Sequence, residues 1–275
     1  MANPAPTMRP FRFGLVAAPR GTDEQWVATA RRAADLGFAT LLAPDGAALH
    51  APLPALAVAA ATVPGLRVCP FVLAPLRSPR VVAWEAASMA ALTGDRFELG
   101  LGTGRPQAAG EAGQLGVPWG SGAQRLERVR ETVAAVRERD GDRRIPVLIA
   151  ASGPRALALA AAEADTVTLA APPETPREQV QAMADRVREL AGPRAAELEL
   201  SMNVFVVGDE LPPWMAAVVA DPAALSGDTL AFLRGSPREM ADELRRRRDT
   251  LGVTYFGVGE AFAERFAPVV ELLAG

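Results

Sequence analysis

The sequence predicts a single (β/α)8 barrel, in which eight parallel strands close into a ring and a helix follows each strand. Short apolar segments alternate along the 275 residues with longer segments whose apolar residues recur every three or four positions. The short segments are mostly apolar and rich in β-branched residues, as strands buried on both faces of a parallel sheet are. Nothing in the pattern resembles an interdomain linker. We therefore expect one domain over residues 1–275, with a flexible N-terminus at residues 1–10; a doubly wound open sheet is the alternative.

The first strand and helix show how each element is predicted. Residues 11–18 form a short apolar strand. Thr22 is a preferred N-cap residue, the helix that it begins runs to Leu36, and Gly37 ends it. The same two signals recur along the rest of the chain. Further strands are expected at residues 40–43, 66–73, 96–101, 145–150, 166–170, 198–207 and 253–258. Further helices are expected at residues 53–62, 80–92, 124–139, 155–164, 177–190, 237–251 and 262–273.

Two glycine-rich junctions stand at the ends of the fourth and fifth predicted strands. The fourth strand continues into Gly102-Thr103-Gly104, and glycine allows a ligand to approach the main chain closely. The fifth ends in Ser152-Gly153-Pro154 at the start of a helix, where free N–H groups and the helix dipole favour anions. In a barrel both junctions lie at the carboxyl ends of neighbouring strands, the face where such folds keep their active sites.

Composition excludes several classes of function. A net charge of −3 without a basic stripe argues against nucleic acid as a partner. The single cysteine, Cys69, excludes an internal disulfide and a multi-cysteine metal site, and we expect it to be a core residue. No apolar run is long enough to span a membrane, and residues 1–10 lack the apolar core of a signal peptide, so we expect a cytoplasmic protein. A serine triad would depend on His50 and lacks a nucleophile-elbow pattern, and the dinucleotide fingerprint is not met.

Motifs spread along most of the chain resemble the bacterial-luciferase-like flavin and deazaflavin oxidoreductases. The most specific is the run from Gly94 to Gly104, Gly-Asp-Arg-Phe-Glu-Leu-Gly-Leu-Gly-Thr-Gly. The other matching pieces are Arg31 to Phe38, Leu42 to Asp45, Leu66 to Val68, Ser78-Pro79 with Glu85, Gly235 to Pro237, Leu244 to Arg248, Leu251 to Tyr255 and Phe266 to Val270. Within that family the chain looks closest to the branch that uses coenzyme F-420, an 8-hydroxy-5-deazaflavin. FMN is the alternative cofactor.

The resemblance implies where the cofactor would bind. The tricyclic ring would lie over the barrel mouth against a bulge in the third strand, near Phe71 and Val72, which carries a non-proline cis peptide in relatives. Asp45 would face the ring. Gly102, Thr103 and Gly104 would line the ring or its ribityl chain, and the phosphate would lie near Ala151, Ser152, Gly153 and Pro154.

The sequence departs from the family pattern at several positions. Relatives often carry histidine directly after the aspartate, where this chain has Gly46, and the sole histidine here is His50. Ser78 stands where many relatives have histidine, and Pro70 lies beside the expected bulge. The chain also passes from residue 139 to residue 145 with almost no connection, where relatives often insert a long segment. The pocket is therefore expected to be open, with room for a bulky substrate.

The reaction that the resemblance implies is hydride transfer between C5 of the deazaflavin and a C=C, C=N or alcohol carbon. Asp45, His50, Glu111 and Tyr255 are the candidate proton donors, with Asp45 and His50 the tentative catalytic pair. Each has a structural alternative, such as a loop hydrogen bond for Asp45 or a place in the barrel core for Tyr255.

Substrate contacts are expected at two loop residues. Arg105 would hold a substrate carboxylate, unless it is simply an exposed arginine. Trp119 would form a wall of the site or anchor its loop.

Three functions remain open from the sequence. The first is an F-420-dependent oxidoreductase acting on a small-molecule or modified-peptide substrate. The second is an FMN-dependent luciferase-like monooxygenase, and the third is a degenerate barrel that binds a flavin or a partner without turnover. No metal, nucleic acid or membrane is expected as a partner, and the barrel is a possible homodimer.

Overall fold

A computed structural model describes residues 9–73, 76–105, 108–141, 143–212, 215, 219, 225 and 228–274, with only the backbone described at Val72 and Leu73. Most of the expected flexible N-terminus at residues 1–10, and much of the irregular stretch at residues 208–225, lie outside the described residues.

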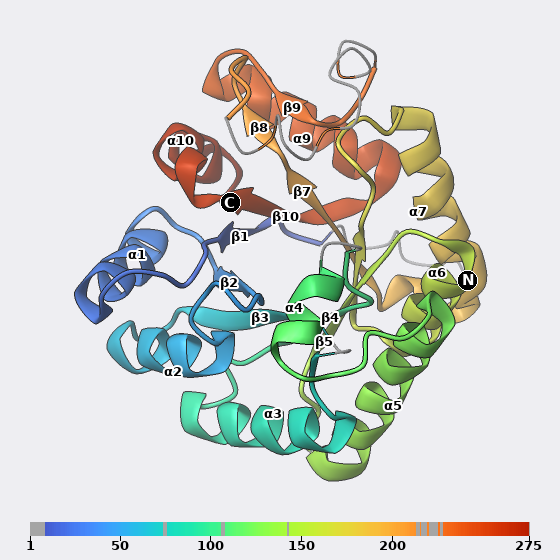
Figure 1. The fold of residues 1–275 in the computed structure, drawn as a ribbon. Helices are drawn as coiled ribbons and strands as arrows, with labels where there is room; N and C mark the ends of the chain where they lie inside the picture. The colour runs from blue at the N-terminus through green and yellow to red at the C-terminus, as the bar shows by residue number, and fades with distance from the viewer. Residues whose placement is uncertain are drawn as a thin grey trace, which may run out of the picture.

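Eight parallel strands close into a barrel, which confirms the predicted (β/α)8 fold over the open-sheet alternative (Figure 1). Around the barrel the order is β1-β10-β7-β6-β5-β4-β3-β2, and β1 pairs with both β10 and β2. The strands are β1 (Arg12–Val16), β2 (Thr40–Pro44), β3 (Arg67–Leu73), β4 (Leu99–Gly102), β5 (Val147–Ala151), β6 (Thr166–Leu169), β7 (Glu199–Val204) and β10 (Val253–Gly259).

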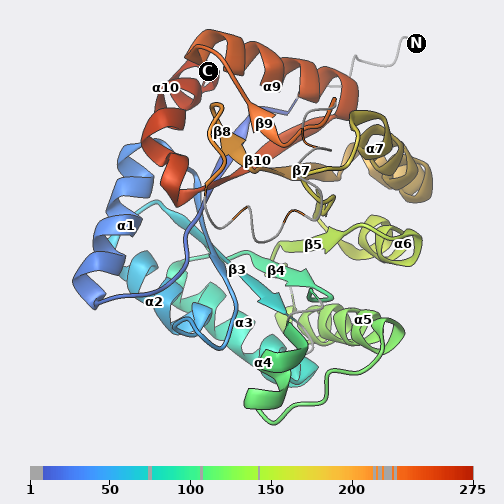
Figure 2. The same ribbon diagram turned by 45° about the horizontal axis from the view of Figure 1, so that its top comes forward.

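Helices surround the barrel as an outer ring (Figures 1 and 2). They are α1 (Asp23–Asp35), α2 (Pro52–Thr62), α3 (Pro79–Thr93), α5 (Gly122–Asp140), α6 (Pro154–Glu163), α7 (Arg177–Ala191), α9 (Pro237–Leu251) and α10 (Ala263–Leu273). Short 3-10 helices occupy Gly192–Ala196 and Glu260–Phe262. Capping boxes begin α1 at Thr22, α5 at Ser121 and α9 at Ser236, so local signals set these boundaries.

Two expectations from the sequence are corrected by the fold. The connection between the predicted strand at residues 96–101 and the predicted helix at residues 124–139, for which no element was expected, contains a short helix, α4 (Ala108–Gln114). The predicted strand at residues 198–207 is two strands, because pairing with β10 ends at Val204. Beyond the barrel rim, β8 (Val206–Val207) pairs instead with β9 (Phe232–Leu233) in a separate two-stranded sheet.

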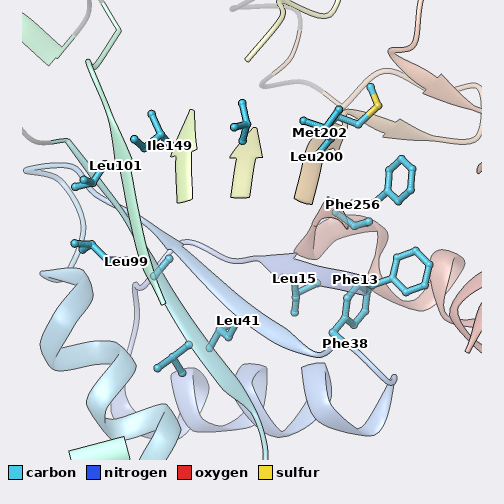
Figure 3. Close-up of a cluster of buried hydrophobic side chains, with 14 of the residues drawn as sticks. Phe13, Leu15, Phe38, Leu41, Leu99, Leu101, Ile149, Leu200, Met202 and Phe256 are labelled. Atoms are coloured by element: carbon cyan, nitrogen blue, oxygen red, sulfur yellow. The ribbon is translucent and has the colours of Figure 1, made fainter. Parts of the chain in front are cut away.

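The main apolar core lies between the barrel wall and the helices. Outward-facing strand residues such as Phe13, Leu41, Leu101 and Phe256 pack there and are almost fully buried (Figure 3). A smaller cluster fills the inside of the barrel, where Leu42, Cys69, Leu148 and Tyr255 pack together. Cys69 is thus a core residue, as expected.

A charged network closes the barrel at the amino ends of its strands. Arg12 of β1 reaches Glu98 at 2.5 Å and Glu199 of β7 at 2.6 Å. Arg67 of β3 also reaches Glu98 at 2.5 Å, and Thr166 of β6 donates to Glu199 at 3.1 Å. The network therefore ties together residues on opposite sides of the barrel.

The guanidinium carbon of Arg12 lies 3.8 Å from the ring centre of Tyr255. Burial alone would lower the pKa of Arg12. The charges of Tyr255, Glu98 and Glu199 outweigh burial and raise the pKa above its ordinary value. Arg12 therefore stays charged inside the barrel, and its two carboxylate partners balance it.

No helix within the described ranges combines the length and the apolar character needed to cross a membrane. The same part of the chain contains no group of three or more His, Cys, Asp or Glu side chains placed to hold a metal ion.

Removing the Glu98 carboxylate should strongly destabilise the barrel. Its side chain is 3% exposed, so Glu98→Ala leaves Arg12 and Arg67 without their shared partner. We expect the free energy of unfolding to fall by about 3–5 kcal/mol, measured by urea denaturation. Arg186→Ala, which removes an exposed ion pair with Glu189, is the control and should change stability by less than about 1 kcal/mol. Equal effects of the two variants would contradict a structural role for the network.

Candidate functional site

The candidate site lies at the carboxyl ends of the barrel strands. The glycine-rich loop after β4 and the start of α6 after β5 meet there, on neighbouring strands that pair from Leu99 to Gly102. Figures 1 and 2 place α4 close to the end of β4, on this same face. The two junctions that the sequence singled out therefore share one end of the barrel.

Small and apolar residues form the floor of this mouth. Side chains alternate along a strand, and the inner cluster of Leu42, Cys69, Leu148 and Tyr255 identifies which residues face inward. The inward-facing residues at or next to the carboxyl ends that we call the mouth floor are Val16, Pro44, Phe71, Gly102, Ala150, Ala170, Asn203 and Gly257. Four of these eight are glycine or alanine, and three of the four, Gly102, Ala150 and Ala170, stand on β4, on β5 and at the end of β6. That side of the floor has room for a flat aromatic ring, because none of the three carries more than a methyl group.

Trp119 anchors the loop that follows β4. Gly104 has a φ of +77°, and a Cβ there would lie 2.5 Å from Cη2 of Trp119. The Arg125 guanidinium stacks over Trp119 at 4.4 Å from the ring centre and donates from Nε to the Thr103 carbonyl at 2.9 Å. Of the two roles expected for Trp119, the structure shows the anchor. Arg105 is exposed and makes no side-chain hydrogen bond or ion pair within the described residues.

The start of α6 has free backbone donors. Gly153 is the N-cap and supplies no side-chain cap, and Pro154 occupies the first turn. Ala151 is buried at the end of β5, whereas Ser152, Gly153 and Pro154 are exposed. The N–H groups of this first turn are thus not used by a side-chain cap, and the anion site there stays a prediction.

Asp45 is held by a residue that the sequence analysis did not single out. Its backbone N–H donates to the Phe71 carbonyl at 3.2 Å. Both carboxylate oxygens bond to Arg77: Nη1 to Oδ2, and Nη2 to Oδ1 at 3.1 Å. The Asp45 side chain is only 6% exposed. The sequence places Arg77 directly before Ser78-Pro79, which begins a helix. It does not show which acidic residue the arginine contacts.

Glu111 brings an unpaired carboxylate to the mouth. It lies on α4, and its Oε2 is buried without a hydrogen-bond partner in the described part of the protein. A Cβ at Gly46 would lie 3.5 Å from that Oε2 and 3.7 Å from Oε1. The Glu111 carboxylate therefore lies over the position where the resemblance led us to expect a histidine. A carboxylate oxygen that is buried without a partner at this end of the barrel is a candidate for proton transfer.

The structure places His50 in a contact between two loops. Its Nε2 lies 2.9 Å from the Gly21 carbonyl oxygen, and its backbone N–H donates to the Pro19 carbonyl at 2.9 Å. These contacts join the loop after β2 to the loop after β1, which gives His50 a structural role whether or not it meets a substrate.

Tyr255 lies inside the barrel rather than at its mouth. Its exposed fraction is 0%, and its hydroxyl oxygen lies 2.8 Å from a Cβ placed at Gly14. Burial raises its pKa well above the ordinary value. The expectation of a core position is confirmed, and Tyr255 is too enclosed to donate a proton at the mouth.

The third strand differs from the expectation drawn from the resemblance. The described residues contain no cis peptide bond, so the structure does not show the one expected near Phe71 and Val72. Pro70 continues the regular pairing of β3, opposite Ala43 of β2. Phe71 is half-buried against the inner cluster, while the side chain of Val72 lies outside the described part of the chain. Ser78 caps α3 by accepting from the Val81 N–H at 3.4 Å.

A family model described as luciferase-like monooxygenase matches residues 11–139 and 137–212. Among curated proteins, an F-420-dependent glucose-6-phosphate dehydrogenase from Beutenbergia cavernae is 37% identical over 137 residues. That match covers 40% of this chain and 40% of the relative, so it spans about two fifths of the relative's length.

Solved structures share the fold over nearly the whole chain. The coenzyme F-420-dependent tetrahydromethanopterin reductase from Methanopyrus kandleri superposes with a TM-score of 0.76 at 16% identity, covering 96% of this chain and 98% of that one. A type II Baeyer–Villiger monooxygenase from a Pseudomonas putida plasmid, in complex with FMN, has a TM-score of 0.70 at 14% identity and covers 96% of each chain.

The packing of Trp119 on Gly104 predicts a contrast between two glycines of one loop. Gly104→Ala forces a side chain into left-handed backbone and against the indole, and should cost about 1–3 kcal/mol of folding free energy. Gly102→Ala is the matched control, since its Cβ would meet only the Ala150 Cβ at 3.9 Å. Urea unfolding followed by tryptophan fluorescence measures both. A Gly104→Ala protein as stable as Gly102→Ala would show that Trp119 does not hold the loop.

Proposed function

This chain belongs to the luciferase-like monooxygenase family, and on that premise we propose that it is an oxidoreductase dependent on coenzyme F-420. It would transfer a hydride between C5 of the deazaflavin and a C=C, C=N or alcohol carbon of a small-molecule or modified-peptide substrate. The observation that carries the proposal is the Oε2 atom of Glu111, which is buried without a hydrogen-bond partner among the described residues and lies over Gly46 at the mouth. The deazaflavin-dependent names of the reductase and of the curated relative support it.

The residues at the mouth fit a ring cofactor that carries a phosphate. Gly102 and Ala150 would lie under the ring, and Thr103 and Gly104 would border it. Backbone N–H groups at the start of α6, after Ser152 and Gly153, would bind the phosphate through hydrogen bonds and the helix dipole. When bound, the deazaflavin supplies a two-electron hydride carrier at C5. The protein's own contribution is to bind, orient and exclude water.

Glu111 would handle the proton of the reaction. Reduction of a polarised double bond requires a proton as well as a hydride, and a positioned acid at the mouth can supply it. Asp45 is less suited to this role, because Arg77 occupies both of its carboxylate oxygens. We therefore assign Asp45 to positioning: with Arg77 it joins the end of β2 to the loop before α3, next to Gly46.

An FMN-dependent monooxygenase is the second candidate, because a solved structure with the same fold is such an enzyme in complex with FMN. The same floor and the same open helix start would accept FMN, which also has a flat ring and a phosphate. A barrel that binds a flavin without turnover is the third candidate. Cofactor binding separates the first two, and hydride transfer separates both from the third.

Titration of the purified protein with oxidised F-420 and, in parallel, with FMN should give tight binding of the deazaflavin. The quenching of cofactor fluorescence provides the readout. Preference for FMN would favour the monooxygenase assignment. Binding of neither cofactor would contradict the proposed cofactor site.

Glu111→Gln should retain cofactor binding and lose proton transfer. Glutamine keeps the shape of the side chain but has no acidic proton, and a lost general acid slows turnover by about a hundredfold or more. Stopped-flow absorbance of the deazaflavin during a single turnover measures the step. Glu131→Gln, on the exposed face of α5, is the control. An unchanged rate in Glu111→Gln would remove Glu111 from the mechanism.

A further inference from the structure

Asn203 is the one polar side chain of the mouth floor as described in this structure. It is the third inward-facing residue of β7, after Glu199 and Ser201, and it pairs in register with Gly257 of β10. The other members of the floor are glycine, alanine, valine, proline or phenylalanine. An amide at one point of an otherwise apolar floor gives that point a specific hydrogen-bonding capacity.

The Asn203 amide has a defined position, but it is not used in hydrogen bonds within the described part of the protein. No described residue forms a hydrogen bond with it, and the residue is half-buried. A Cβ at Gly257 would lie 2.5 Å from its Oδ1 and 3.4 Å from Cγ2 of Val16. The amide therefore extends across β10 toward β1, into space that exists only because residue 257 has no side chain. Its donor and acceptor are available to a ligand in the mouth.

The mouth floor around Asn203 carries no charged side chain. The amide lies over Gly257 and toward Val16, which are both apolar. Moving a charged group into such surroundings without a partner costs several kcal/mol. A neutral group that hydrogen bonds to the amide meets no such penalty.

Asn203 also lies away from the proposed cofactor contacts. Those contacts follow β4 and β5, whereas β7 is separated from β5 by β6 in the barrel order. Glu111 lies over Gly46, at the end of β2, and β1 and β10 separate β2 from β7. A ligand group at Asn203 therefore meets a different strand from those that carry the proposed cofactor contacts and Gly46.

We propose that Asn203 determines substrate specificity by hydrogen bonding to a neutral oxygen-bearing group of the substrate, a hydroxyl, carbonyl or amide. This inference rests on the proposed function and narrows it to uncharged substrates at that end, in contrast to phosphate esters or carboxylates. In the reducing direction the reacting carbon gains a hydride, the adjoining atom of the double bond gains a proton, and the reduced deazaflavin is oxidised by two electrons.

The test uses matched probes and four proteins. The probes are α,β-unsaturated ketones and secondary alcohols that carry a second hydroxyl or amide group, and analogues with a carboxylate or phosphate in its place. Ligand-observed NMR measures their binding with and without F-420, and absorbance of the cofactor measures turnover. The proteins are wild type, Asn203→Leu, Gly257→Ala and Gly259→Ala.

The two glycine variants provide the internal control. Gly257→Ala keeps the amide but displaces it, whereas a Cβ at Gly259 of the same strand would meet nothing closer than Phe262 at 4.0 Å. We expect neutral probes to bind wild type, and kcat/KM to fall about tenfold in Asn203→Leu and Gly257→Ala. Gly259→Ala should match wild type, and the dissociation constant of F-420 should be unchanged in all four proteins.

Several outcomes would overturn the inference. The inference fails if anionic probes bind in preference to neutral ones, or if no neutral probe binds. It also fails if Asn203→Leu is indistinguishable from wild type. Weaker F-420 binding in Asn203→Leu would make the amide a cofactor contact instead. Failure of wild type to bind F-420 would instead overturn the proposed function. The NMR comparison of Asn203→Leu with wild type would still decide the role of the amide.

Discussion

The ion pairs around Glu98 are the constraint on which the rest of the barrel depends. A closed ring of eight parallel strands must fill its interior, and here charge fills the amino end through Arg12, Glu98, Arg67 and Glu199. Burying one member without its partners would be unfavourable, so the strands that carry them must come together in one register. With that end fixed, the carboxyl end can be lined by residues as small as Gly102 and Ala150 and still keep its shape.

At the mouth, small residues leave space and a few polar side chains enter it. Glycine at positions 46 and 257 leaves space that the Glu111 carboxylate and the Asn203 amide enter. Arg77 takes up the Asp45 carboxylate, whereas Oε2 of Glu111 has no hydrogen-bond partner among the described residues. The result is a flat apolar floor with an acid at one side and a neutral amide at another. Such an arrangement suits an uncharged substrate placed over a planar cofactor.

The fold could be predicted from the sequence because most strands are short, mainly apolar segments and most helices carry their own start signals. The glycine junctions after β4 and β5 were also predictable, since glycine and proline act locally. Contacts between distant segments were not: the pairing of Arg77 with Asp45, and the placement of Glu111 over Gly46, depend on how loops close over the mouth. Tyr255 and Asn203 lie far apart in the sequence. The register of β7 against β10 sets their positions, with Tyr255 inside the barrel and Asn203 at its mouth. The cis peptide expected from the resemblance is absent from the described residues.

A crystal structure of the protein with oxidised F-420 would test the central claim most directly. The account predicts electron density for the deazaflavin ring over Gly102 and Ala150. Its phosphate should lie within hydrogen-bonding distance of the backbone N–H groups that begin α6, and the Glu111 carboxylate should face the reacting side of the ring. A ring bound elsewhere on the barrel, or a phosphate far from α6, would contradict it.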